Sequence, residues 1–297
     1  MRVAITGASG LIGAALSGQL REDGHEVVHL VRREPHGPQE ARWDPQGTVD
    51  TAALEGADAV VHLAGAGIGD HRWTESYKKK IRDSRTAGTR TLAEALAGLD
   101  RPPRVLISAS AVGFYGDTGD RETDESGPQG AGFLAGLVRD WEAAAAPAAA
   151  AGIRVVHPRS GPVLAREGGF LGKVLPLFKL GLGGPLGNGR QWMSWISLPD
   201  QLAGLRFLLD RDDVEGPVNL TAPHPVTNAE FTRAVGKALR RPAVLPVPAA
   251  ALRLAVGRFA DEAILVSQRV VPRRLTEAGF TFEHPDVDSA ACGVLRA

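Results

Sequence analysis

Three glycines near the N-terminus have the spacing of a loop that binds phosphate groups. Gly7, Gly10 and Gly13 lie in ITGASGLIG, between a predicted strand at 2–6 and a helical pattern at 11–22. The first permits a tight turn, the second lets backbone N–H groups approach a pyrophosphate, and the third lets the helix pack closely on the strand. The positive end of the helix favours the negative charge. The segment predicts a dinucleotide site made by Gly7, Ser9, Gly10, Leu11, Ile12 and Gly13.

Two arginines end the second predicted strand, at 25–32, in LVRRE. A carboxylate at this position would accept hydrogen bonds from the ribose hydroxyls of NAD. Arg32 and Arg33 suit a 2′-phosphate instead, because a guanidinium is a fixed donor of positive charge. We therefore predict NADP(H), with Arg32 as the stronger candidate. Two alternatives stay open: a solvated pair of surface arginines, and a ribose contact from Glu34.

The third predicted strand, at 57–65, ends in small residues. Leu63, Ala64 and Gly65 in HLAGAGI let the adenine and ribose side of a nucleotide lie against the backbone. We interpret His62, inside the strand, as a packed core histidine rather than a base.

The elements that position these residues alternate along the N-terminal half. Strands are predicted at 2–6, 25–32, 57–65, 104–110 and 152–159, with helical segments at 11–22, 73–99 and 134–146 between them. The strands are continuous apolar runs, typical of a parallel sheet that is buried on both faces. The pattern predicts an α/β, Rossmann-like, doubly wound fold.

The composition of the chain changes after Pro162: glycines and prolines cluster between Gly168 and Gly189. We predict an NADP-binding domain at 1–165 and a small C-terminal substrate lobe at 166–297. Part of the lobe, at about 200–222, contains a predicted helix and strand that return to the first domain. Thr227 and Glu230 form a capping-box pattern ahead of a further helix.

Composition excludes several classes of function. Formal net charge is zero, which argues against a general nucleic-acid binder. No apolar run approaches the length of a membrane span, so we expect no membrane partner and a cytoplasmic protein. The lone Cys292 permits neither an intrachain disulfide nor a cysteine-rich metal cluster, and we expect no metal site.

Several motifs in order make the chain resemble the extended short-chain dehydrogenase/reductase superfamily. They are ITGASGLIG, DAVVHLAG, LISASAVGFYG and WISLPDQLAG. Within it, RWTESYKKKIRDSR, DWEAAA, RSGPVL and GLGGPLGNGRQWMSWI resemble an atypical branch, the NAD-dependent epimerase/dehydratase-like family. This resemblance implies a cofactor pocket that also includes Val31, Lys80, Arg85 and Val163. It further implies an unidentified small-molecule substrate, and it admits a homodimer through paired helices.

Active members of the superfamily use a serine or threonine after the fourth strand and a Tyr-x-x-x-Lys pair on the next helix. Ser110 matches the serine. With Glu142 as the anchor of the register, Phe133 and Leu137 stand where the tyrosine and lysine would be. Three interpretations stay open. Tyr115 replaces the missing acid, hydride transfer proceeds with Ser110 and backbone donors alone, or the protein is a catalytically silent NADP(H)-binding sensor or partner-binding module.

The segment GNGRQWMSWI offers side chains suited to an anionic or ring-bearing ligand. We predict substrate contacts from Arg190, Gln191 and Trp192. The alternative is an ordinary loop whose aromatic residues pack against the first domain. Asp200, further on, is predicted to position a helix N-terminus rather than to take part in catalysis.

Overall fold

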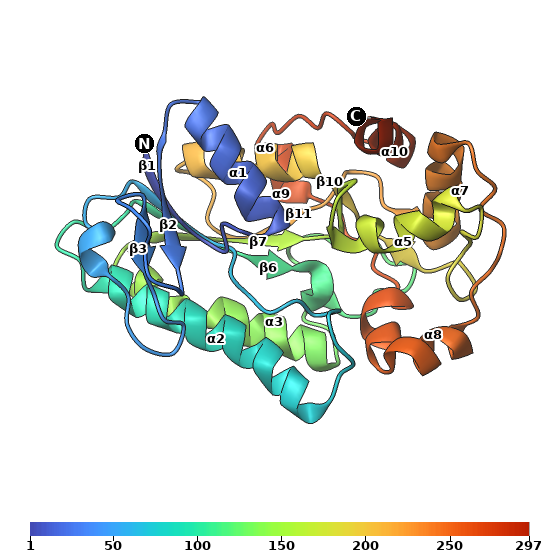
Figure 1. The fold of residues 1–297 in the computed structure, drawn as a ribbon, viewed down its shortest axis with the longest axis horizontal. Helices are drawn as coiled ribbons and strands as arrows, with labels where there is room; N and C mark the ends of the chain where they lie inside the picture. The colour runs from blue at the N-terminus through green and yellow to red at the C-terminus, as the bar shows by residue number, and fades with distance from the viewer. Residues whose placement is uncertain (297) are drawn as a thin grey trace.

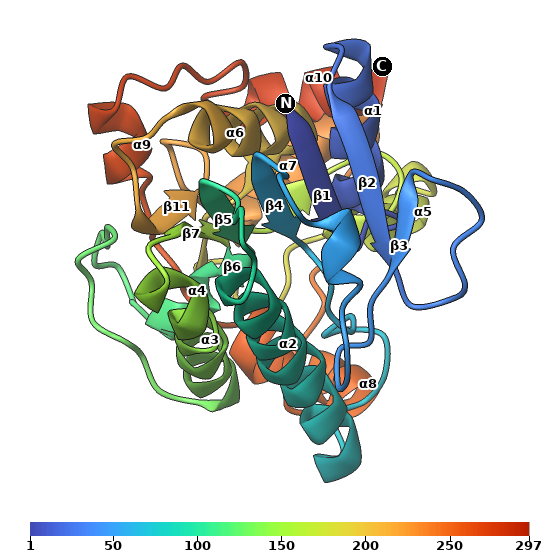
Figure 2. The ribbon, with the colours of Figure 1, turned by 90° about the vertical axis from the view of Figure 1, so that its left-hand side faces the viewer.

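A parallel sheet forms the centre of the computed structural model, which describes residues 1–296. Figure 1 shows the sheet among its helices. Its strand order is β11-β7-β5-β4-β1-β2-β3, with the short β6 also paired to β7, and Figure 2 labels these strands. The order reverses beside β1, which lies between β2 and β4, and open α/β sheets bind ligands at such a reversal. The strands are β1 (Arg2–Thr6), β2 (Glu26–Val31), β3 (Glu40–Arg42), β4 (Ala59–His62), β5 (Val105–Ser108), β6 (Ser110–Ala111), β7 (Arg154–Ser160) and β11 (Gly216–Leu220).

Helices cover both faces of this sheet, as Figure 2 shows. Helices α1 (Leu11–Glu22) and α6 (Leu198–Asp210) bury leucines against one face. Helices α2 (Glu75–Ala97), α3 (Phe133–Ala143) and α4 (Ala146–Ala150) cover the other. Consecutive strand residues such as Val60 and Val61 belong to the two different cores, which explains why the strands are apolar without alternation. The predicted doubly wound fold is confirmed.

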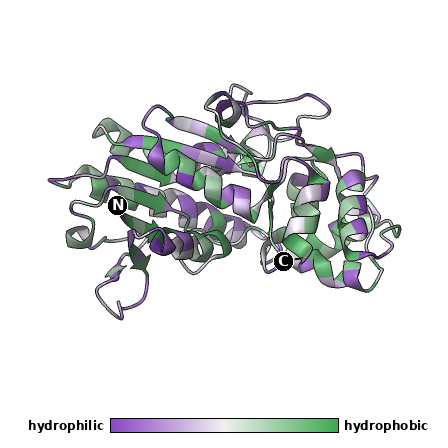
Figure 3. Ribbon diagram, turned by 90° about the horizontal axis from the view of Figure 1, so that it is seen from above, coloured by the Kyte–Doolittle hydropathy of each residue, from purple (hydrophilic) through white to green (hydrophobic). Residues whose placement is uncertain are grey.

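The second lobe has a core of its own, built on α5 (Gly169–Lys179), α7 (Asn228–Leu239) and α10 (Val287–Arg296). Figure 3 shows it as a separate group of helices beside the sheet domain. The predicted capping box of Thr227 and Glu230 begins α7. The remaining short elements are β8 (Val163–Leu164), β9 (Trp192–Met193), β10 (Ile196–Ser197), β12 (Val226–Thr227), α8 (Ala249–Val256), α9 (Arg273–Glu277) and the turns η1 (Thr51–Ala53), η2 (Val112–Tyr115) and η3 (Ala260–Ile264).

Several details differ from the sequence prediction. The strand predicted at 104–110 is divided into β5 and β6, and the helix predicted at 134–146 ends at Ala143. Pro147 lies in the first turn of α4, where its missing N–H costs nothing. The strand β3 and the helices α8, α9 and α10 were not predicted. They are short or lack a clear apolar period, so local sequence carried little signal for them.

The chain returns to the sheet domain twice. Leu205 and Leu208 of α6 and Val218 of β11 belong to the core of the sheet. Leu275 of α9 joins the same core. Asp200, in the first turn of α6, accepts hydrogen bonds from the backbone N–H groups of Glu283 (2.7 Å) and His284 (3.0 Å), so its carboxylate also secures the C-terminal segment.

No helix among the residues that the structure describes is long and apolar enough to cross a bilayer.

His62 is fully buried at the end of β4, as predicted for a core histidine. Its Nδ1 lies 2.7 Å from Thr6 Oγ1, and its ring meets Trp43 edge-on. The Thr6 hydroxyl also accepts hydrogen bonds from the backbone N–H groups of Leu63 (3.1 Å) and Ala64 (3.2 Å). This contact therefore shapes the loop that follows β4. Burial, assisted by the nearby charge of Arg85, lowers the pKa of His62 to about 4.

This lowered pKa predicts a pH-dependent loss of stability. The unfolded chain, with a histidine pKa near 6.5, binds a proton that the folded chain excludes. Stability is therefore complete above about pH 6.5 and falls by up to about 3 kcal/mol as the pH drops to about 4. His62→Gln should remove this part of the pH dependence in urea unfolding, whereas the same change at exposed His36 should leave it in place. Equal pH slopes in the wild type and His62→Gln would contradict the prediction.

Candidate nucleotide and active site

The glycine turn joins β1 to α1 at the strand reversal. A Cβ on Gly7, whose φ is 69°, would lie 2.8 Å from the backbone carbon of Leu63. A Cβ on Gly13 would lie 2.3 Å from the Gly7 carbonyl oxygen. No side chain caps α1, whose N-cap is Gly10. The turn is therefore a cradle that only glycines can line, with the first N–H groups of α1 free to face an anion.

The other predicted residues of the turn are not buried. Ser9 is exposed, and Leu11 and Ile12 are half-buried in the first turn of α1. Gly168 and Gly169, at the start of α5, approach Leu11, so the second lobe reaches the edge of the cradle. Val163, in β8 next to that segment, is half-buried and its strand pairs with β10.

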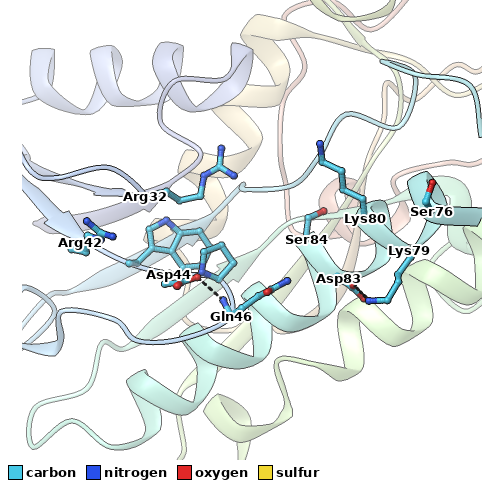
Figure 4. A pocket seen from close by; sticks show the side chains of 11 residues that line it. Arg32, Arg42, Asp44, Gln46, Ser76, Lys79, Lys80, Asp83 and Ser84 are labelled. Carbon is cyan, nitrogen blue, oxygen red and sulfur yellow. Dashed lines mark hydrogen bonds and ion pairs between the residues drawn. The ribbon is translucent and has the colours of Figure 1, made fainter.

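A basic cavity of about 610 Å³ opens beside the end of β2 (Figure 4). Arg32 borders it from the strand, and Lys80 and Ser84 border it from α2 on the other side. Trp43, Pro45 and Gln46 line it from the loop after β3. Arg32 and Lys80, predicted for different reasons, therefore face the same space. Two cations that border one cavity suit a phosphate group. The Ser84 hydroxyl is engaged within the protein, because it donates to the Ile81 carbonyl (2.9 Å) and accepts from the Ala66 N–H (3.0 Å).

Neighbouring charged groups of this segment are engaged elsewhere. The two terminal nitrogens of the Arg33 guanidinium, Nη1 and Nη2, donate to the carboxylate of Glu40 at 2.7 and 2.5 Å. Glu34 is ion-paired with Arg42. Arg32 takes part in none of the ion pairs within residues 1–296. The structure thus places Arg32 at the cavity, whereas Arg33 is bound to Glu40 and does not line it, so that its contact with the cofactor stays a prediction.

Arg85 lies beneath the loop that follows β4. Its Nη1 donates to the carbonyls of Ala66 (2.9 Å) and Ile81 (3.3 Å), and its guanidinium carbon lies 5.0 Å from the Trp141 ring centroid. A Cβ on Gly65 would come within 3.2 Å of it. Burial lowers the pKa of Arg85 to about 10, so the group stays cationic at neutral pH. The structure therefore brings a cation under the predicted contacts Leu63, Ala64 and Gly65.

Ser110 belongs to a buried polar cluster at the end of the sheet. Its hydroxyl donates a 2.5 Å hydrogen bond to Glu142 Oε1. Both oxygens of Glu142 accept from Arg159, each at 2.8 Å, and the two side chains are 14% and 4% exposed. Phe114 lies against the guanidinium, with its ring centroid 3.6 Å from Cζ. An ionised carboxylate can only accept hydrogen bonds. The Ser110 hydroxyl therefore donates its proton to the hydrogen bond with Glu142, and its oxygen can only accept hydrogen bonds from a ligand.

Tyr115 has a different role from the one predicted. Its hydroxyl donates to Asn219 Oδ1 (2.7 Å) and accepts from Arg159 Nη1 (3.0 Å), and the residue is 2% exposed. Burial raises its pKa, which opposes release of the phenolic proton. We therefore correct the candidate acid Tyr115 to a structural residue that ties η2 to β11.

The structure places Phe133 and Leu137 on the side of α3 that faces α2. Phe133 meets the Trp73 ring edge-on at 5.2 Å, and Leu137 is buried among Trp73, Tyr77 and Ile81, so both face α2. Leu134 and Val138 instead face Gly113 beside Ser110, in the same row as Glu142. Neither pair of residues carries a hydroxyl or an amine.

The residues predicted to bind substrate have structural contacts. The amide nitrogen of Gln191 donates to the carbonyls of Leu186 (3.0 Å) and Ile264 (3.3 Å). Trp192 donates to Asp120 at 2.9 Å and lies under the guanidinium of Arg269. Arg190 is exposed, and its backbone N–H closes a turn with Asn188. Gln191 and Trp192 therefore fit the alternative of a packed loop.

Sequence reasoning missed Arg159 and Asn219. Arg159 ends the apolar run GIRVVHPR, and a charged residue in that position was the available signal. A buried arginine needs a carboxylate partner, so the position indicated a buried ion pair. No local signal identified Asn219, whose partners come from η2 and from the segment after η3.

Comparison with known proteins agrees with this geometry. Residues 3–220 match the model of the NAD dependent epimerase/dehydratase family, and residues 247–292 match a domain of unknown function, DUF1731. The chain is 50% identical to an epimerase family protein of Mycobacterium tuberculosis, over 97% of this chain and 95% of that protein. It is 38% identical to the human epimerase family protein SDR39U1, over 98% of each.

Solved structures show the same relationship. The crystal structure of human SDR39U1 with NADPH matches with a TM-score of 0.91 at 36% identity, covering 100% of this chain and 99% of that one. A nucleoside-diphosphate sugar epimerase of Corynebacterium glutamicum matches with a TM-score of 0.83 at 39% identity, covering 99% of this chain and 58% of that one. The chain therefore belongs to the NAD dependent epimerase/dehydratase family.

Proposed function

We propose that this protein is an NADP(H)-dependent oxidoreductase of the epimerase family, acting on a small molecule that carries a hydroxyl or carbonyl group. The observation that carries the cofactor choice is the cavity in which Arg32 and Lys80 face each other while Arg33 and Glu34 are ion-paired elsewhere. A relative of the same fold, human SDR39U1, is described with NADPH, which supports the choice.

The residues present fit this cofactor. The glycine cradle and the uncapped start of α1 would hold the pyrophosphate, and Arg32 and Lys80 would hold the 2′-phosphate. Val31, Leu63 and Ala64 would border the adenosine, with Arg85 and Val163 further along the cleft. When bound, NADP(H) supplies or accepts a hydride. A catalytic role for the chain itself must come from Ser110 and its partners.

We assign Ser110 as the side chain that contacts the reacting oxygen of the substrate. Its proton is committed to Glu142, so the serine oxygen favours a substrate that donates, such as an alcohol. Arg159 holds Glu142 in place through two hydrogen bonds and thereby fixes the direction of the serine lone pairs. In this arrangement the Ser110 oxygen would accept a hydrogen bond from the substrate hydroxyl and hold it in place, while Glu142 stays paired with Arg159.

Arg32→Ala should weaken NADPH binding by about 10- to 100-fold and leave NADH binding nearly unchanged, because the lost contact is a charge-assisted bond to the 2′-phosphate. Fluorescence titration of the purified protein with each nucleotide measures both affinities. Arg33→Ala is the matched control and should keep the preference, since Arg33 is bound to Glu40. Tighter binding of NADH than NADPH by the wild type would refute the assignment of the cofactor.

Ser110→Ala should lower turnover by about 100-fold or more while NADPH affinity stays within about twofold, because only the contact to the reacting oxygen is lost. Absorbance of the nicotinamide, followed with a panel of nucleoside-diphosphate sugars, secondary alcohols and carbonyl compounds, measures turnover. Tyr115→Phe is the control: it removes a buried hydroxyl and should lower stability by about 1–2 kcal/mol while turnover remains. Tight NADPH binding with no turnover on any compound would instead support a silent, cofactor-binding protein.

A further inference from the structure

The large exposed apolar side chains of the described residues all lie in the second lobe. They are Leu177 (50% exposed), Leu180 (72%), Leu182 (51%), Val244 (74%), Leu245 (48%) and Leu254 (78%). All six are aliphatic. We call the surface that Leu177, Leu180, Leu182, Val244 and Leu245 form with the neighbouring Lys179, Arg240 and Arg241 the apolar-basic surface.

Two chain segments make most of this surface, and they lie side by side. Leu182 N–H donates to the Leu177 carbonyl (2.9 Å), which folds the end of α5 back on itself. Leu245 N–H donates to the Gly183 carbonyl (3.2 Å), and a Cβ on Gly181 would touch the Pro242 ring. The leucines of 177–182 are therefore continuous with Val244 and Leu245, at the end of the second lobe away from the sheet (Figure 1).

Helix α8 is a further exposed apolar element of the second lobe. Its sequence is AAALRLAV, and none of its residues is buried. It begins at Ala249, just after Val247 forms a bridge to Leu186. A helix of this composition ordinarily buries one face. Here the leucine that is most exposed, Leu254, points away from the lobe core.

The charged side chains that lie next to these residues without an ion-pair partner are basic. The segments 168–199 and 231–260 contain no aspartate or glutamate. Lys173, Lys237 and Arg253 pair with carboxylates from outside these segments. Lys179, Arg240 and Arg241 are exposed next to the aliphatic residues and take part in none of the ion pairs of the described chain.

We propose that the apolar-basic surface binds the surface of an anionic lipid bilayer. Exposed leucines beside lysine and arginine are the composition of interfacial membrane contacts, which gain from apolar insertion and from attraction to anionic headgroups together. A second copy of the chain is a poor fit, because an isologous contact would place like charges opposite one another. A protein partner is also less suited, because protein interfaces favour aromatic anchors and this surface exposes none.

This association requires no spanning helix, and it revises the expectation from sequence that the protein has no membrane partner. It also leaves the nucleotide cavity free, because that cavity is lined by β2, α2 and the loop after β3. Nucleotide affinity therefore serves as an independent measure that a surface variant is correctly folded.

The test is flotation of the full chain with vesicles of phosphatidylcholine alone and of equal parts phosphatidylcholine and phosphatidylglycerol. The protein should float only with the anionic vesicles and should be released at about 0.5 M NaCl, where charges are screened. Arg240→Glu with Arg241→Glu should weaken binding at least about 25-fold, since each basic residue contributes about fivefold. Leu180→Asp with Val244→Asp should abolish it. The matched control, Arg90→Glu with Arg121→Glu, reverses two exposed charges outside the surface and should bind as the wild type does.

Three results would overturn the proposal. The wild type fails to float with anionic vesicles at low salt, the control variant loses binding as strongly as the surface variants, or sedimentation shows a dimer that Leu180→Asp with Val244→Asp dissociates. The last result would assign the surface to a second copy of the chain. All variants should keep the NADPH affinity of the wild type, which shows that they are folded. If the protein binds no nucleotide at all, circular dichroism replaces this folding control. The flotation result then still tests the membrane proposal independently of the proposed cofactor.

Discussion

A buried guanidinium needs a carboxylate, and the pairing of Arg159 with Glu142 meets that need where the sheet, α3 and the second lobe converge. The pair fixes Ser110 from one side and Tyr115 from the other. Tyr115 in turn binds Asn219 of β11, whose amide donates to the carbonyl of Val271. Removal of either partner would leave an uncompensated charge in the interior, so the position of the candidate catalytic serine depends on this one ion pair.

The Arg159–Glu142 ion pair is also relevant to the absence of a Tyr-x-x-x-Lys sequence. In enzymes that have the Tyr–Lys pair, the lysine cation lies on the same helix as the tyrosine. Here the corresponding face of α3 carries Leu134, Val138 and Glu142, and the buried cations come from other elements: Arg159 from β7 and Arg85 from α2. The site therefore keeps positive charge close to the cofactor cleft while its hydroxyl is oriented by a carboxylate rather than by an amine.

The segment that matches DUF1731 helps to hold this arrangement. Gln268 donates to the carbonyls of Val112 (3.2 Å) and Gly116 (3.1 Å), on both sides of Tyr115. Glu262 accepts from the backbone N–H of Leu134 (3.0 Å) at the start of α3. Residues after 260 thus contact the loop that follows Ser110 and the start of α3.

The sequence alone determined the doubly wound sheet, the glycine cradle, and Arg32 at the end of β2, because these depend on local periodicity, on backbone conformations open only to glycine, and on charge type at a known strand end. It also indicated His62 as a core residue and Ser110 at the sheet edge.

The tertiary structure decided which charged groups remain available to bind a ligand. Arg32 and Arg33 are adjacent in the chain, and only the position of Glu40 on β3 separates their roles. It likewise decided that Tyr115 is a buried structural residue, since Arg159 and Asn219 reach its hydroxyl from strands 44 and 104 residues away. Such pairings depend on long-range packing, which no local pattern of residues encodes.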